Sequence, residues 1–152
     1  MTTSVLPVPD ELRACGRACD PNFDPQENLF LRFQNQAGGR IEPTDVRCPD
    51  QSVNRGKYSK PEWVLLPSFP EWGIGCIKVA DVPTRLLKGD GTPVHFQVEH
   101  DPQEDNYAHS EIRAYADFTL QDRLRKIKSN PLKLTFRTIL SQKATILKYP
   151  AS

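Results

Sequence analysis

The chain of 152 residues contains three histidines, and two of them lie in one polar stretch, HDPQEDNYAHSE, at residues 100–111. His100 and His109 offer two imidazoles, and Glu111 offers a carboxylate. If a loop joins two antiparallel strands here, these three side chains are expected to converge. Such a set can bind one divalent metal such as zinc, or act as general acid and base without a metal. The alternative is a solvated loop followed by a polar strand.

A second candidate site is the basic segment QSVNRGKYSKPEW at residues 51–63. Cations and hydroxyl groups around a glycine can converge on a phosphate or another anion. Arg55, Tyr58 and Lys60 are therefore candidate contacts for an anionic substrate, and Lys57 is a candidate catalytic cation. The spacing differs from that of a phosphate-binding P-loop. The alternative is a solvated basic loop.

The four cysteines are a third source of chemistry. Cys48 follows Arg47 in a polar, proline-flanked segment, where a nearby cation would favour the thiolate. Cys48 is thus a further candidate metal ligand. Cys15 and Cys19 have C-x3-C spacing, which on a helix could provide half of a zinc site. The alternative for all four is a reduced, packed thiol.

Alternating polarity predicts the strands that would position these groups. On a strand over 94–100, His100 lies on the apolar face and is expected to be buried, whereas His95 is expected to be exposed. A strand over 109–118 places His109 and Glu111 on its polar face. Further strands are predicted at 29–33, 63–66, 74–79 and 144–149.

Two helix-start signals lie near the C-terminus. Thr119 with Asp122 resembles an N-cap followed by an acidic residue, and Asn130–Pro131 repeats the signal. Phe136 then falls on the apolar side of the second helix. The pattern predicts an irregular N-terminal arm over 1–28, followed by a single α+β domain over 29–152, with a mostly antiparallel sheet and two basic amphipathic helices.

Charge is unevenly distributed, although the net charge is only +1. Residues 119–152 carry +7 and residues 1–118 carry −6. The C-terminal segment is therefore expected to contact an acidic protein or nucleic acid. Alternatively, the two parts neutralise each other within the fold. The basic residues of the segment are Arg123, Arg125, Lys126, Lys128, Lys133, Arg137, Lys143 and Lys148.

Neither a membrane-spanning run nor a signal peptide is expected from the sequence. No apolar stretch reaches the length of about 18 residues that a spanning helix needs. The N-terminal residues lack a basic start followed by an apolar run. We therefore expect a cytoplasmic protein with reduced cysteines and no membrane contact.

These observations support two functional hypotheses. The first is a small cytosolic hydrolase, with a ribonuclease as one version, that uses His100, His109 and Glu111 on an anionic substrate. The second is a non-catalytic interaction protein that docks an acidic partner through its basic C-terminal face. The substrate and the oligomeric state stay open at this stage.

Overall fold

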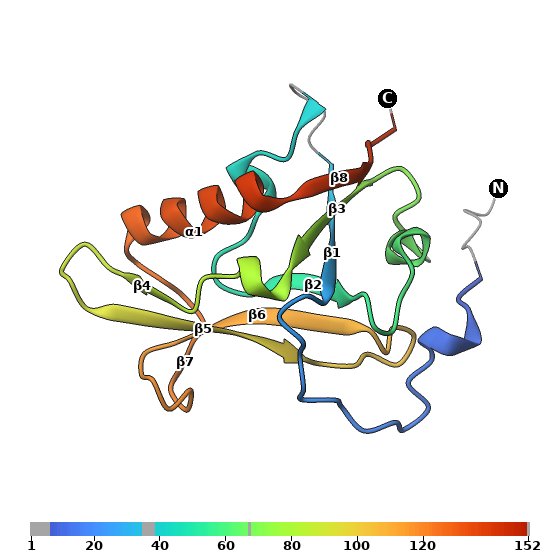
Figure 1. The fold of residues 1–152 in the computed structure, drawn as a ribbon, viewed down its shortest axis with the longest axis horizontal. Helices are drawn as coiled ribbons and strands as arrows, with labels where there is room; N and C mark the ends of the chain where they lie inside the picture. The colour runs from blue at the N-terminus through green and yellow to red at the C-terminus, as the bar shows by residue number, and fades with distance from the viewer. Residues whose placement is uncertain (1–6, 35–38, 67, 152) are drawn as a thin grey trace.

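A computed structural model describes residues 7–34, 39–66 and 68–151. The chain forms an eight-stranded sheet in the order β4-β5-β6-β2-β1-β3-β8, and β7 pairs with β6 (Figure 1). All strand pairs are antiparallel. The strands are β1 (Asn28–Phe33), β2 (Gln51–Arg55), β3 (Gly73–Lys78), β4 (Arg85–Leu87), β5 (Pro93–His100), β6 (His109–Tyr115), β7 (Arg123–Leu124) and β8 (Thr145–Lys148).

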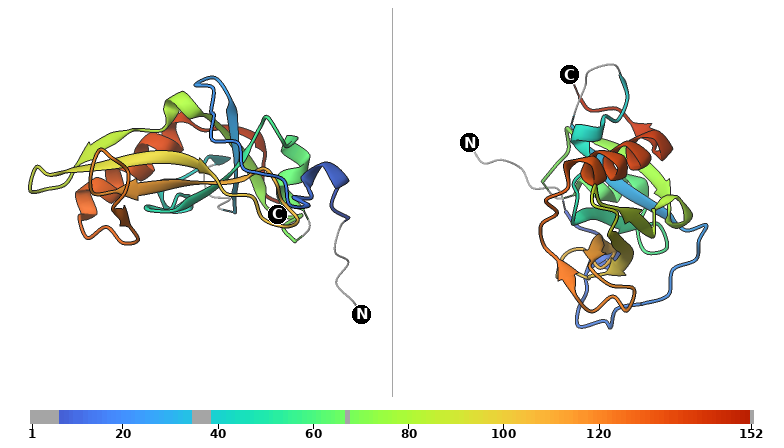
Figure 2. Two further views of the ribbon diagram at one scale, coloured as in Figure 1. Left: turned by 90° about the horizontal axis from the view of Figure 1, so that it is seen from below. Right: turned by 90° about the vertical axis from the view of Figure 1, so that its left-hand side faces the viewer.

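One face of the sheet packs against α1 (Asn130–Lys143), which lies along that side of the molecule (Figure 2). The helix begins where the Ser129 hydroxyl accepts the Leu132 N–H at 3.4 Å. Phe136 is fully buried and stacks on Phe96 of β5 at 4.7 Å between ring centres. Within the described chain, no helix is both long and apolar enough to cross a membrane.

Short 3₁₀ turns lie in the N-terminal arm and between strands. In the arm is η1 (Asp10–Leu12), and between successive strands are η3 (Pro43–Asp45), η4 (Pro61–Leu65) and η5 (Val79–Asp81). The strand predicted at 63–66 is wrong, because most of this segment belongs to η4. Pro61 begins that turn, and the Leu66 N–H closes it on the Trp63 carbonyl at 3.1 Å.

The prediction of two basic amphipathic helices is wrong, because α1 is the one α-helix in the part of the chain that the structure describes. Leu120, inside the other predicted helix, has a left-handed φ of 59°. Such a conformation interrupts a right-handed helix. Leu124 then pairs with Ala114 of β6, and Arg123 forms an ion pair with Asp50 at 3.0 Å. The segment is therefore held by strand pairing and by this ion pair, although its leucines have helical spacing.

The sheet face opposite α1 is polar around its centre. Asn54 of β2 pairs with His109 of β6, and Ser52 pairs with Glu111. Paired residues lie on the same face of a sheet. Phe30 of β1 pairs with Asn54, so Phe30 lies on this face as well. The candidate chemistry of His109 and Glu111 is therefore separated from the core by the sheet itself.

We predict that Phe136→Ala lowers the free energy of unfolding by about 3–5 kcal/mol, because it removes a buried ring and leaves a cavity. Leu134→Ala is the matched control on the same helix, since Leu134 is 61% exposed. The control should change stability by no more than about 0.5 kcal/mol. Urea unfolding measures both. Equal effects of the two substitutions would contradict the described packing of α1.

Candidate functional site

The two histidines of the predicted site point to opposite sides of the sheet. His100 pairs with Ser110, so it shares a face with Ser110, and the adjacent His109 lies on the other face. Their expected convergence on one ligand therefore does not occur. His109 and Glu111 do lie together, with 3.9 Å between Nε2 and Oε1.

His100 is buried, as predicted, whereas His95 is half-buried instead of exposed. The Nδ1 atom of His100 accepts the Asp20 N–H at 2.8 Å, and Nε2 donates to the Tyr107 carbonyl at 2.5 Å. Tyr58 stacks on the imidazole at 5.6 Å between ring centres. Burial lowers the pKa of His100. Both ring nitrogens are thus occupied in a neutral imidazole that fastens the N-terminal arm.

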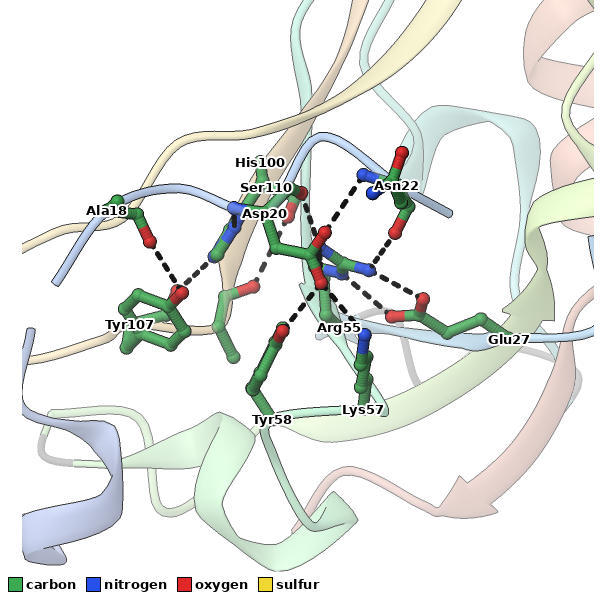
Figure 3. Close-up of polar contacts among 11 residues, drawn as sticks. Ala18, Asp20, Asn22, Glu27, Arg55, Lys57, Tyr58, His100, Tyr107 and Ser110 are labelled. Carbon is green, nitrogen blue, oxygen red and sulfur yellow. Dashed lines mark hydrogen bonds and ion pairs between the residues drawn. The ribbon is translucent and has the colours of Figure 1, made fainter. Parts of the chain in front are cut away.

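Arg55 is the centre of this cluster and is fully buried (Figure 3). Its Nε and Nη2 atoms donate to the two Glu27 carboxylate oxygens at 2.9 and 2.8 Å. Nη1 donates to the Asp20 carbonyl at 2.7 Å, and Nη2 also donates to the Asn22 carbonyl at 2.6 Å. The guanidinium lies 3.9 Å from the centre of the Phe23 ring. Arg55, a predicted substrate contact, therefore ties residues 20–27 to β2.

The Asp20 carboxylate accepts hydrogen bonds from two more residues of the predicted basic site, Lys57 and Tyr58. Its Oδ2 atom accepts the Tyr58 hydroxyl at 2.6 Å and the Lys57 ammonium at 2.9 Å (Figure 3). Hydrogen bonds from Tyr58 and Lys57 hold the Asp20 pKa far below its usual range. The same bonds raise the pKa of Lys57 and of Tyr58. All three groups are thus held in their ordinary protonation states, unlike catalytic groups, whose pKa values are tuned toward the working pH.

Lys60, the remaining predicted contact of the basic segment, lies outside this cluster. The Lys60 ammonium lies 5.2 Å from the centre of the Trp63 ring, and Lys60 is exposed.

Sequence reasoning missed Asp20 and Glu27 as partners of Arg55 in this cluster. The alternation of β2 could have indicated only that Arg55 is buried, because it places Arg55 on the same face as the buried Val53. A buried arginine needs acidic partners.

Cys48 is buried in the core, and burial raises the pKa of its thiol to about 11. The nearby cations Arg137 and Lys133 offset only part of this effect. The predicted thiolate at Cys48 is therefore wrong, since burial outweighs the nearby charges. Among the residues that the structure describes, no group of three or more His, Cys, Asp or Glu side chains could hold a metal ion.

His109 keeps one nitrogen available for chemistry. Its Nδ1 atom donates to the Asp101 carbonyl at 2.8 Å, which leaves Nε2 as an acceptor. The side chain lines a cavity of about 120 Å³ on the polar face of the sheet. Glu111 is held by Arg113 at 3.4 Å and by Arg123 at 3.8 Å. An imidazole with a free acceptor beside a carboxylate is an arrangement that can move a proton.

The basic C-terminal segment is mostly unneutralised. Arg123 pairs with Asp50, and the Lys148 ammonium donates to the carbonyls of Trp72 and Pro70 at 2.9 and 3.4 Å. The other six cations have no ion-pair partner among the described residues. We refer to these six as the basic C-terminal face: Arg125, Lys126, Lys128, Lys133, Arg137 and Lys143.

No known protein family, curated protein or solved structure matches the chain. We refer to Arg55, Asp20, Glu27, Tyr58 and His100 as the arm cluster. The polar atoms of this cluster already have hydrogen-bond partners within the protein. His109 with Glu111, and the basic C-terminal face, are the groups whose interactions with the protein are incomplete.

We predict that acid weakens the fold partly through His100. In the unfolded chain a histidine titrates near pH 6.5, and the folded pKa of His100 lies lower. Between the two values the unfolded chain binds the additional proton, so the free energy of unfolding falls as pH drops below about 6.5. His100→Gln should flatten this part of the curve. Urea unfolding between about pH 7 and pH 5 measures it, and identical slopes for both proteins would contradict the assignment.

Proposed function

We propose that the protein is a non-catalytic interaction protein that docks an acidic protein through the basic C-terminal face. The observation that supports this most directly is the set of six cations without a carboxylate partner in the described chain. Like charges gathered on one segment repel one another, and an acidic partner relieves this repulsion. Asp122 is the one acidic residue in that segment.

The chemistry of the surface favours a protein over a nucleic acid. Leu134, which is 61% exposed on α1, adjoins Lys133 in sequence, and Phe118 is 81% exposed before β7. Exposed apolar side chains close in sequence to these cations suit a protein partner, because protein interfaces combine an apolar core with a polar rim. The isoelectric point of about 7.7 is also below the value above 9 that is typical of domains that bind nucleic acid.

A cytoplasmic location is part of this proposal. All four cysteines are free thiols, as is usual where the environment is reducing. Two of them, Cys15 and Cys19, are exposed, and they would be open to oxidation outside the cell. The acidic partner would therefore be an intracellular protein.

Hydrolysis of an anionic substrate is a second candidate function, supported by the position of His109. The free Nε2 atom of His109 adjoins Glu111 and faces a polar cavity that Arg32 also lines. In this scheme His109 accepts a proton as the attacking hydroxyl or water oxygen bonds to phosphorus, Glu111 stabilises the resulting imidazolium, and Arg32 binds the anion. The P–O bond to the leaving group then breaks, and the imidazolium returns the proton to the leaving oxygen. His100 has no part in the reaction, because both of its ring nitrogens are occupied.

We predict that the double substitution Lys126→Glu and Lys128→Glu weakens binding to an acidic polypeptide by at least about tenfold at low salt, because each reversal replaces attraction with repulsion. The matched control is Lys60→Glu with Lys78→Glu, which changes the charge equally at exposed positions elsewhere. Polyglutamate is the probe, and fluorescence anisotropy at several salt concentrations is the measurement. The proposal fails if both double variants bind equally, or if wild type binds single-stranded RNA but not polyglutamate.

For the second candidate, we predict that His109→Ala reduces cleavage of a ribodinucleotide, the shortest RNA substrate, by at least about a hundredfold, the usual contribution of a general base. His95→Ala is the matched control, since His95 lies on a neighbouring strand outside the cavity lining. Cleavage of the dinucleotide is followed by chromatography. Absence of cleavage by wild type, or equal rates for both variants, would refute this version of the hydrolase hypothesis.

A further inference from the structure

The polar face of the sheet is hollowed by two adjoining cavities. The smaller contains His109, and a larger one of about 360 Å³ lies beside it. Arg32 of β1 and Ser52 of β2 line both cavities, so these form one cleft across the two strands. Its combined size is within the range of small-molecule sites, which are commonly about 300–1,000 Å³. The arm cluster of Figure 3 lies about Arg55, whose side chain is on the other face of the sheet.

Arg32 is a half-buried cation without a counter-ion. Its guanidinium lies 3.9 Å from the centre of the Phe69 ring. Among the described residues its one hydrogen bond is a long one, at 3.5 Å, to the Val64 carbonyl. No carboxylate forms an ion pair with it among the described residues. Burial lowers the pKa of Arg32, and no acid offsets this effect. Because burying an uncompensated charge is costly, the cleft favours an incoming anion.

Arg55 and Arg32 differ in how their guanidinium groups are surrounded. Both arginines are on strands of the same sheet, but Arg55 has two carboxylates and two backbone carbonyls around its guanidinium. Arg32 has one carbonyl and an aromatic ring. The donors of Arg32 are thus largely unused, and a guanidinium presents a planar pair of donors that matches a phosphate or carboxylate.

The surroundings of Arg32 add a second cation and a flat apolar wall. Arg47, which is exposed and has no ion-pair partner among the described residues, lines the larger cavity. Trp72 is half-buried on the same cavity and contacts Phe69 edge-to-face at 5.2 Å between ring centres. Asp45 also lines the cavity, where its carboxylate accepts the Glu42 N–H at 2.9 Å. An anionic group near two arginines and a planar ring against Trp72 would fill such a cleft.

We propose that the cleft over β1 and β2 binds a small anionic ligand that carries a planar ring, the chemistry of a nucleoside monophosphate. Arg32 and Arg47 contact the phosphate, and Trp72 stacks on the base. This site is independent of the basic C-terminal face proposed above for a protein partner.

A longer nucleic acid is disfavoured by the charge beyond the cleft. The same sheet face continues onto β5 and β6, where Glu99, Asp101 and Glu111 surround Arg113. Arg123 also contacts Glu111, but it is paired with Asp50 as well, so four carboxylates are shared by two guanidinium groups. This part of the face is therefore acidic and would repel a continuing phosphate backbone. A single nucleotide avoids this region, because the larger cavity is lined by β1, β2 and the segments 44–47 and 69–72, and by no residue of β5 or β6.

Intrinsic fluorescence tests this directly, because the chain has only two tryptophans. In a Trp63→Phe background, Trp72 is the single reporter, and titration with AMP, GMP, CMP and UMP should give saturable quenching by at least one of them. Adenosine and inorganic phosphate alone should bind more weakly than AMP, since each offers half of the contacts. Calorimetry on the wild-type protein repeats the titration without any substitution at Trp63.

Arg32→Gln should weaken the binding by at least about tenfold, because it removes the buried cation that the phosphate meets. Arg85→Gln is the matched control, as Arg85 is an exposed arginine on β4 with no ion-pair partner among the described residues. The control should bind like wild type. The proposal is overturned if neither fluorescence nor calorimetry detects binding of any of the four nucleotides, or if Arg32→Gln and Arg85→Gln bind them equally. Either result would leave the proposed protein docking standing, because binding to polyglutamate is measured separately and depends on the basic C-terminal face.

Discussion

The buried ion pair between Arg55 and Glu27 is the interaction on which the placement of the N-terminal arm depends. A guanidinium taken out of water loses several kcal/mol of hydration, so it must be surrounded by acceptors. The end of β2 provides none of these from its own strand. They come from residues 20–27, through the Glu27 carboxylate and the carbonyls of Asp20 and Asn22. An irregular segment is thereby fixed in one conformation without a helix or strand of its own.

The same requirement determines which polar groups can contact a ligand. Once the arm is in place, the Asp20 N–H occupies His100, and the Asp20 carboxylate occupies Lys57 and Tyr58. The basic segment that resembles a ligand site in the sequence therefore has a structural role, which is to hold the N-terminal arm against the sheet. The polar groups left with incomplete partners are elsewhere, in the cleft around Arg32 and His109 and on the basic C-terminal face. This separation is the physical basis of both proposals.

Much of the sheet could be predicted from alternation, because one buried face imposes a period of two. The strand that ends at His100 and the burial of that residue follow from this rule. The same rule predicts that the two histidines lie on opposite faces, since it assigns His100 to the apolar face and His109 to the polar face. The predicted site is wrong because a short loop brings two strands together but cannot bring side chains on opposite faces of the sheet to one ligand.

Other errors arose from interactions that are distant in sequence. The second helix was predicted from local spacing, but β7 is stabilised by pairing with β6 and by the contact of Arg123 with Asp50, 73 residues away. The Cys48 thiolate was predicted from its neighbour Arg47, although burial in the core decides its pKa. The arm cluster joins Arg55 to acids 28 and 35 residues earlier, and no local pattern identifies such partners.

The unfolding free energy of Glu27→Gln tests the central claim most directly, because this change removes one charge and keeps the shape of the side chain. If the Arg55–Glu27 pair holds the arm, stability should fall by about 3–5 kcal/mol, the usual cost of leaving a buried charge unpaired. Backbone amides of residues 20–27 should then exchange faster with deuterated solvent. Glu62→Gln, at an exposed position, is the control. A loss below about 1 kcal/mol, with unchanged exchange in the arm, would contradict the account.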